Sequence, residues 1–363
     1  TRERRKMRQT LRCLLSSSSN TTTLRIASIN DVYKLDNLPK LSKYISKLSS
    51  QNHQKKPNAV LLCGDFLSPS TLSSIDGGRG TCETIAASGI THVSFGNHEA
   101  DVGLPTLAAR VSELKKSRVQ VVNTNARSTT SPSWLMDKTS PYSIVGTDCG
   151  RIKVALLGLL GDGDNMFRDG TFRGVSIENV PSTFSDYYKT LVEGGVVDFM
   201  IPMTHQSLES DVLLAQTMSS YVERGVIFGG HEHHIIDETT MDNIRILKMG
   251  CDAEMASLVD FTFCLSSRKL VNVEASFVDL TVMEDSVVVK KIVEKHMAGI
   301  RKMEEEVIVD ESVYKGDILS SEGTRYKQTS VGAFFCQAIK EELETDVALL
   351  NGGSIKGGMT YSQ

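Results

Sequence analysis

Five short apolar segments of the sequence each end in side chains that can bind a metal ion. In chain order, these side chains are Asn30 and Asp31, Asp65, Asn97 with His98 and Glu99, His205, and His231 with His233. Together with His234, these stretches hold five of the eight histidines of the chain. Imidazole nitrogens combined with carboxylates and an amide oxygen favour zinc, manganese, iron, cobalt or nickel over calcium and magnesium. The residue types therefore predict a transition-metal centre.

The number of donors indicates more than one ion. Six or seven donors are available, whereas one tetrahedral ion needs only four. Two divalent ions that share a bridging carboxylate would use all of them. Two ions about 3.5–4 Å apart stabilise both the attacking and the leaving oxygen of a displacement at phosphorus. The donor set therefore favours the hydrolysis of a phosphate ester.

The segments that must position these side chains alternate between strand-like and helix-like patterns, which is typical of an α/β fold. The predicted strands are 24–29, 59–63, 91–95, 119–122, 152–160, 196–201, 226–228 and 244–249. Residues 38–48 and 104–115 space their apolar side chains as amphipathic helices do, and alternation over 256–282 predicts antiparallel strands. Because active sites of open α/β sheets lie beyond the carboxyl ends of the strands, we expect the five groups to converge there.

The two ends of the chain have a different composition. Residues 1–23 are rich in Arg and Ser and poor in acidic residues, which indicates a disordered tail or an organelle-targeting segment. The charged stretch 288–307 predicts an exposed linker helix, and a helix at 331–343 with a strand at 347–350 predicts the start of a second α/β unit.

Composition excludes several classes of protein. The 363 residues suffice for about two domains, and 40% of them are hydrophobic, enough to form packed cores. A net charge of −4 provides no field for nucleic acid, and no apolar run reaches the roughly 20 residues of a membrane span. Seven cysteines without a CxxC pair favour a reducing compartment, and hence an intracellular or organellar location over secretion. The sequence leaves the oligomeric state open.

The ordered series of motifs resembles that of the calcineurin-like metallophosphoesterases, and Gly96–Asp101 and Thr204–Gln206 resemble its 5′-nucleotidase branch in particular. The resemblance spans residues 24–356 and implies a four-layer α-β-β-α sandwich with two mixed sheets. It also implies a catalytic domain at 24–285, a linker helix at 286–312, and at 313–363 the truncated start of a C-terminal substrate-binding domain. Most of that domain's base-stacking side chains would then be missing.

The resemblance also implies a role for each site residue. Asp65 would bridge the two ions; Asp31 and His233 would complete the first metal site, and Asn97, His205 and His231 the second. His98 would contact the phosphoryl oxygens or protonate the leaving oxygen, with Asp101 orienting its ring. Asn351, Gly353 and Lys356 would contact the substrate, a nucleoside 5′-monophosphate.

Two departures from the family pattern leave alternatives open. Tyr33 stands where a histidine ligand of the first ion is expected, so it is either a metal ligand or a residue that lines the site. Lys356 stands where an arginine is usual, which keeps the charge but loses the bidentate geometry. The alternatives are a 2′,3′-cyclic nucleotide phosphodiesterase and a degenerate, non-catalytic nucleotide-binding protein. His92 and His234 are expected to be structural.

Overall fold

The computed structural model describes residues 20–50, 56–129, 134–163, 166–306, 318–355 and 357–361. The described residues up to Ile300 form one compact unit, and those from Arg301 onwards form a second. The predicted N-terminal segment lies outside the described residues up to position 19.

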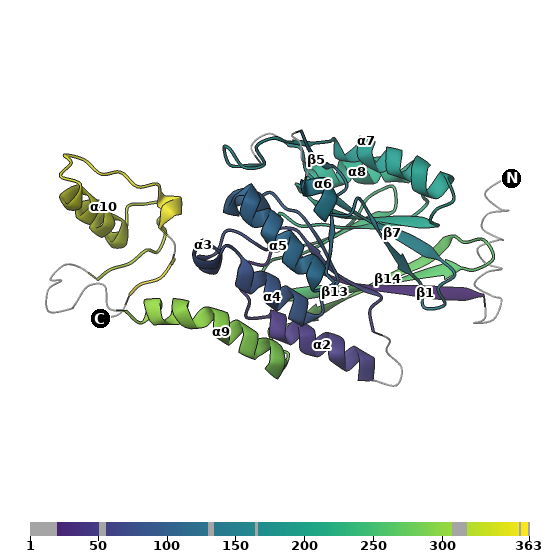
Figure 1. Cartoon of the computed structure of the whole chain (residues 1–363), viewed down its shortest axis with the longest axis horizontal. Helices are drawn as coiled ribbons and strands as arrows, with labels where there is room; N and C mark the ends of the chain where they lie inside the picture. Colours follow the sequence, from purple (N-terminus) through teal and green to yellow (C-terminus); the bar gives the residue numbers. More distant parts are fainter. Residues whose placement is uncertain are drawn as a thin grey trace. The chain divides into compact units, whose positions relative to one another are not determined.

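Two six-stranded sheets form the centre of the first unit (Figure 1). The first has the order β14-β13-β1-β2-β3-β4, and its strands are β1 (Thr21–Ile29), β2 (Ala59–Cys63), β3 (His92–Ser94), β4 (Gln120–Val122), β13 (Met255–Cys264) and β14 (Leu270–Asp279). The second has the order β11-β12-β10-β9-β7-β6, and its strands are β6 (Ser143–Gly146), β7 (Lys153–Leu160), β9 (Phe199–His205), β10 (Gly225–Phe228), β11 (Ile235–Thr239) and β12 (Ile244–Met249). Both sheets are mixed: their central strands pair in parallel, while β13, β14, β6 and β11 pair antiparallel with their neighbours.

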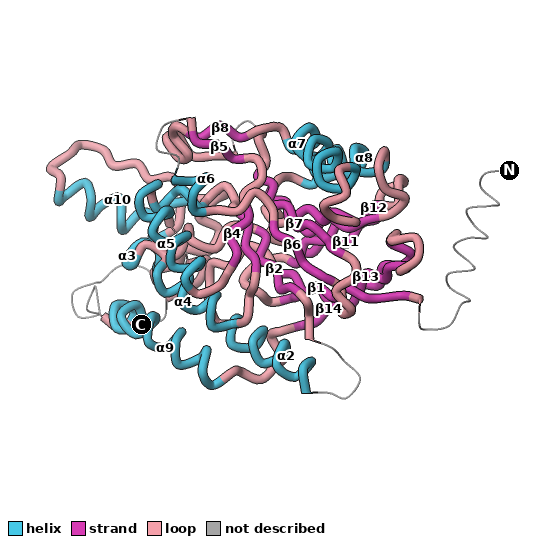
Figure 2. The backbone as a smooth tube through the Cα atoms, turned by 45° about the vertical axis from the view of Figure 1, so that its right-hand side comes forward, coloured by secondary structure: helices cyan, strands magenta, loops and turns pink. Residues whose placement is uncertain are grey.

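Helices cover the outer face of each sheet, as Figure 2 shows. The helices on the side of the first sheet are α2 (Leu38–Ser50), α3 (Thr71–Asp76), α4 (Arg79–Ser88), α5 (Leu104–Lys116) and α9 (Val287–Glu304), and those on the second sheet are α7 (Val180–Tyr187) and α8 (Leu208–Ser219). Short elements complete this unit, namely η1 (Glu99–Val102), β5 (Ala126–Ser128), α6 (Trp134–Lys138), β8 (Val175–Ile177) and η2 (Tyr188–Glu193). The predicted four-layer α-β-β-α sandwich is therefore confirmed.

Three apolar cores separate the four layers, and the sequence periodicity accounts for them. In β1, Leu24 and Ile26 face the core between the two sheets, whereas Ala27 and Ile29 face the core under the helices. A strand buried on both faces is continuously apolar, as β2 is from Ala59 to Cys63, and such a run is recognisable in the sequence. None of the described helices combines the length and apolarity that crossing a membrane requires.

Three predictions about the chain ends need correction. The sheet begins at Thr21, before the predicted boundary at 24, because β13 extends far enough to pair with it. The helix predicted to be an exposed linker buries one side, since Val293 and Ile300 join the core under the helices. The prediction of a strand at 347–350 is wrong: these residues pair with no other strand among the described residues, and Leu349 is 89% exposed. A strand needs neighbouring strands to satisfy its backbone groups.

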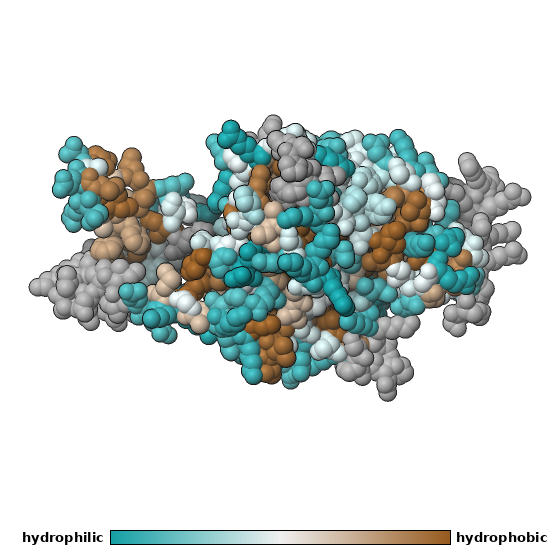
Figure 3. Space-filling model, in the orientation of Figure 1, coloured by the Kyte–Doolittle hydropathy of each residue, from teal (hydrophilic) through white to brown (hydrophobic). Residues whose placement is uncertain are grey.

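The second unit contains α10 (Ser330–Glu342), which was predicted, and the short helix η3 (Gly352–Ser354). Apolar side chains are exposed over α10 in Figure 3, where they are brown. Phe335 in α10 and Leu343 directly after it are exposed, whereas Val331 is buried. This unit therefore buries only part of its apolar surface.

Candidate metal centre

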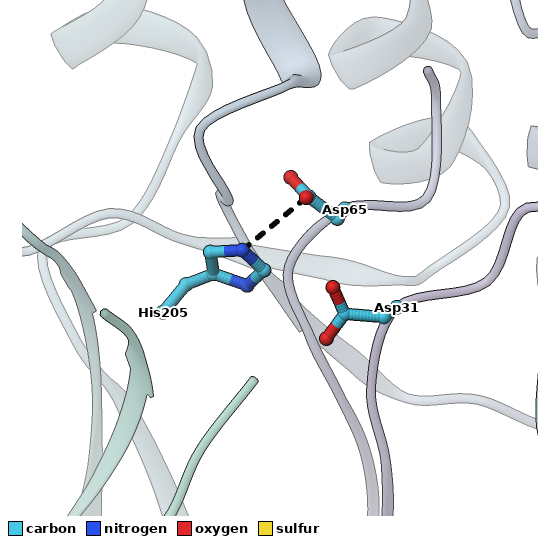
Figure 4. A group of neighbouring side chains, drawn as sticks. All are labelled: Asp31, Asp65 and His205. Carbon is cyan, nitrogen blue, oxygen red and sulfur yellow. Dashed lines mark ion pairs between the residues drawn. The ribbon is translucent and has the colours of Figure 1, made fainter. Parts of the chain in front are cut away.

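The candidate site lies where strands of both sheets end. Asp31 follows β1, Asp65 follows β2, and His205 is the last residue of β9. Their side chains point toward one another (Figure 4), and one ligand atom from each lies within 4.8 Å of the others. These three side chains therefore converge at the carboxyl ends of their strands, as the sequence predicted.

The loops that carry the ligands approach one another very closely. Asp31 and Asp65 both have the left-handed backbone conformation, each with φ of +51°, and the Val32 amide donates to the carbonyl of Asp65 at 2.8 Å. At Gly230, a Cβ atom would lie 2.7 Å from His205 Nδ1 and 2.9 Å from Asp31 Oδ2. Only glycine leaves room for this approach, which explains the glycine beside the fifth group of ligands.

Four donor atoms form a cluster that we call the Asn97 subsite, made of Asp65, Asn97, His205 and His231. Asn97 Oδ1 lies 3.1 Å from His205 Nε2 and 3.2 Å from His231 Nδ1, and His205 Nε2 lies 3.3 Å from Asp65 Oδ2. Donors that are 2.0–2.1 Å from a tetrahedral ion lie about 3.3–3.4 Å from one another. The donor set and its spacing therefore fit a divalent transition-metal ion.

Neighbouring groups fix the orientation and the charge of this subsite. His205 Nδ1 donates to the carbonyl of Cys63 at 2.9 Å, which directs Nε2 into the cluster. Burial lowers the pKa of His205, but the carboxylates of Asp65 and Asp31 outweigh it and raise this pKa to about 10. Burial likewise raises the pKa of Asp65, but His205 outweighs it and lowers this pKa to about 2. A cation bound by these residues would take the place of the proton of His205.

A second cluster, which we call the Tyr33 subsite, consists of Asp31, Asp65, Tyr33 and His233. The Tyr33 hydroxyl lies 3.2 Å from Asp31 Oδ1, 3.0 Å from Asp65 Oδ2 and 3.1 Å from His233 Nε2. Burial, followed by the charges of Asp65 and Asp31, raises the pKa of this phenol far above its usual value. The hydroxyl is therefore protonated and donates to a carboxylate.

His98 lies beside the donors without joining either cluster. Its backbone amide donates to Asp65 Oδ1 at 2.9 Å, and its ring Nδ1 lies 2.8 Å from Asp101 Oδ2. Asp101 Oδ2 also forms an ion pair with Arg168 Nη1 at 3.2 Å. The side chain of His98 is 25% exposed, so Nε2 is the ring nitrogen left for a bound molecule.

Glu99 holds the Asp65 loop in place, a role that the sequence did not reveal. Its buried carboxylate accepts hydrogen bonds from the backbone amides of Asp65 at 3.0 Å and Phe66 at 2.7 Å, and also from those of Leu67 and Gly96. Burial and the charge of Asp65 raise the pKa of Glu99 to about 7. Its position directly after His98 was the only sequence signal.

A buried ionic cluster behind the histidines was also missed. Lys248 Nζ donates to the carbonyl of Gln206 at 2.7 Å and pairs with Asp211 Oδ2 at 2.8 Å and with Glu232. Glu232 in turn accepts from the amide of Leu208 at 2.7 Å. The cluster joins the end of β9, where His205 lies, to the segment after β10, which carries His231 and His233. A lysine inside the apolar run 244–249 was the available signal.

The predicted site residues fall into two groups. The structure brings together Asp31, Tyr33, Asp65, Asn97, His98, Asp101, His205, His231 and His233. Asn351 and Gly353 belong to the second unit, where the Asn351 side chain accepts from the amide of Gly353 at 3.0 Å. Lys356 lies outside the described residues.

Both histidines that were expected to be structural lie outside the two clusters. His92 is buried in β3 and its ring bonds to the hydroxyls of Thr91 and Ser143. His234 is exposed.

Residues 24–234 match the protein family described as calcineurin-like phosphoesterase. The match covers more than half of the chain, and the chain therefore belongs to this family. Enzymes of the family use divalent metal ions to hydrolyse phosphate esters. In this chain, Asp31, Asp65 and His205 form a group that could hold a metal ion. No curated protein matched the sequence.

Solved structures with the same fold include several nucleotidases. A 5′-nucleotidase precursor from Thermus thermophilus has a TM-score of 0.68 at 16% identity, over 89% of this chain and 67% of its own. A putative 5′-nucleotidase from Staphylococcus aureus has a TM-score of 0.65 at 13% identity, over 89% of this chain and 66% of its own. The phosphoesterase YfkN from Bacillus subtilis has a TM-score of 0.61 at 15% identity, over 79% of this chain and 100% of its own. The chain thus spans about two thirds of the length of the two nucleotidases.

Proposed function

We propose that this protein is a metal-dependent hydrolase of phosphate esters and that nucleoside 5′-monophosphates are its substrates. The observation that carries the proposal is the spacing of the four donors in the Asn97 subsite, with His98 beside them. A divalent ion held by Asp65, Asn97, His205 and His231 would supply Lewis-acid chemistry toward a phosphoryl oxygen and would lower the pKa of bound water. The other steps of the proposed hydrolysis, contact with the phosphate and protonation of the leaving oxygen, are assigned to side chains of the protein.

His98 is the proposed catalytic residue. Asp101 holds its Nδ1 at 2.8 Å, so Nε2 is directed at the substrate and either stabilises the phosphoryl oxygens or protonates the leaving oxygen. Arg168, paired with Asp101 and largely exposed, adds positive charge for the phosphate dianion. The His98 amide, bonded to Asp65, ties the position of the catalytic residue to that of a metal ligand.

The nucleotide part of the proposal rests on the sequence motifs and on the fold. The motif series resembles the 5′-nucleotidase branch, and two of the similar structures are described as 5′-nucleotidases. Asn351 and Gly353 form an Asn-capped turn in the second unit, and the substrate contact that the sequence motif implies for them stays a prediction.

The test is hydrolysis of two esters by the metal-loaded protein, measured as phosphate release from AMP and as p-nitrophenol release from bis-p-nitrophenyl phosphate. We expect release from AMP that stops when a chelator is added. Faster turnover of the diester would favour the cyclic nucleotide phosphodiesterase, and metal-loaded protein that hydrolyses neither ester would contradict the proposal.

The contacts of Tyr33 favour one alternative in particular, a non-catalytic nucleotide-binding protein. Binding of AMP by the metal-loaded chain, without any release of phosphate, would support that alternative.

A further inference from the structure

The hydroxyl of Tyr33 occupies the point at which ligands of the first ion would converge. It lies within 3.2 Å of one donor atom from each of Asp31, Asp65 and His233. An ion at this point would need those donors at about 2.0–2.2 Å. A side-chain hydroxyl and an ion cannot share the same space.

The donors of the Tyr33 subsite are also engaged by the protein itself. Asp31 Oδ1 accepts from the Tyr33 hydroxyl, and Asp31 Oδ2 accepts from Asn30 at 2.8 Å and from the His231 amide at 2.9 Å. His233 is the most exposed ligand candidate, with 54% of its side chain accessible. An ion there would have to displace a buried hydroxyl and break bonds that satisfy a buried carboxylate, which is costly.

Among the described residues, the Tyr33 hydroxyl contacts the Asn97 subsite through Asp65 Oδ2 alone, the donor atom that both subsites share. Three distances between the donors of the Asn97 subsite are 3.1–3.3 Å, close to the spacing around a tetrahedral ion. In the described part of the chain, the bond of the His205 ring to a group outside the cluster uses Nδ1, the nitrogen that points away. The two subsites share Asp65, but they differ in what lies between their donors.

We propose that the Tyr33 hydroxyl takes the place of the first metal ion, so that the chain binds one divalent ion tightly, in the Asn97 subsite. The phenol satisfies the carboxylates of Asp31 and Asp65 in place of a cation. This inference rests on the proposed function only in taking the centre to be a metal site. It replaces the two-ion centre implied by the sequence with a mononuclear one.

The experiment measures bound metal per chain. The full protein is stripped with a chelator, titrated with Zn²⁺ and with Co²⁺ in a calorimeter, and analysed for metal content after dialysis. We expect one tightly bound ion per wild-type chain. Tyr33→His, which replaces the hydroxyl with a ligand, is expected to retain a second ion. Tyr326→His, an exposed tyrosine of the second unit, is the control and should leave the count at one.

Tyr33→Phe distinguishes a blocking hydroxyl from a ligand. If the hydroxyl blocks the subsite, the Phe variant binds at least as much metal as the wild type. Two tightly bound ions in the wild type, with one lost in Tyr33→Phe, would overturn the proposal. The wild-type count alone decides the matter if a variant does not fold.

The outcomes separate this inference from the proposed function. Two ions with phosphatase activity would remove the inference and leave the function. One ion without any ester hydrolysis would leave the inference and remove the function. No bound ion would overturn both.

Discussion

His98 and His205 are oriented in the same way, each through its Nδ1 nitrogen. Asp101 holds the first ring and the Cys63 carbonyl holds the second. The tautomer and direction of an imidazole are set by the partner of its other nitrogen. The sequence predicted the residue types that surround the centre, because each follows an apolar strand. It could not predict what Tyr33 contacts, since a residue type does not fix where a side chain points.

Replacing His98 tests catalysis at a single residue. We expect His98→Ala to lower kcat for AMP by about 10²–10⁴-fold, the usual contribution of a positioned acid or base. Metal content should not change, because His98 belongs to neither subsite. Phosphate release and metal analysis measure the two effects. His234→Ala, on the exposed neighbour of the site, is the control, and an equal loss of activity in it would contradict the role of His98.

His92 should make stability depend on pH. Burial lowers the pKa of His92 to about 4 in the folded protein, against about 6.5 in the unfolded chain. Below pH 6.5 only the unfolded state takes up this proton, so the free energy of unfolding falls as the pH drops from 6.5 toward 4, by up to roughly 3 kcal/mol.

Urea unfolding at pH 7 and at pH 4.5 measures this effect. The decrease in stability between the two pH values should be smaller in His92→Gln than in the wild type. Equal decreases in both proteins would mean that His92 is not the group responsible.

At the scale of secondary-structure elements, the site depends on what joins the ends of neighbouring strands. Most predicted strands and the helices α2 and α5 were confirmed, because their apolar spacing is dictated by two buried faces or one. The links between loops were not predictable. Lys248 lies in β12, far along the chain from Asp211, and only the fold brings their charges together.

Breaking the buried cluster should destabilise the first unit strongly. In Lys248→Met the carboxylates of Asp211 and Glu232 lose their cation inside the protein. We expect a loss of about 3–5 kcal/mol in the free energy of unfolding, together with weaker metal binding because the loops after β9 and β10 are no longer joined.

Lys295→Met is the matched control, since the ion pair of Lys295 with Glu83 is largely exposed. Its cost should be about 0–1 kcal/mol. Denaturant unfolding of both variants decides the question, and similar values for the two would show that the buried cluster contributes no more than a surface pair.

At the scale of the whole molecule, two sheets from distant parts of the chain supply one centre. Asp31, Asp65 and Asn97 come from the first sheet, and His205 and His231 from the second. Metal binding should therefore stabilise the packing of one sheet on the other. The strand predicted at 347–350 failed for a reason of the same scale, because its local pattern was apolar but it has no strand to pair with among the described residues.

Chelation provides the corresponding measurement. Adding Zn²⁺ to stripped protein should raise the free energy of unfolding by about 2.7 kcal/mol at a free concentration one hundred times Kd. If the chain binds a single tight ion, the free energy of unfolding should rise linearly with the logarithm of the free metal concentration. The slope of that line should be the slope for one bound ion per chain. A slope of two sites would disagree with a mononuclear centre, and a melting temperature independent of metal would disagree with any metal centre in the native fold.

The close packing around Gly230 limits which substitutions the protein can tolerate at this position. A single methyl group at that position would press on the Cys63 carbonyl, on the ring of His205 and on the carboxylate of Asp31 together. No one neighbour can move aside without disturbing the other two. New specificities are therefore easier to acquire at the rim of the site, around Arg168, than at its floor, where the main chain leaves no spare volume.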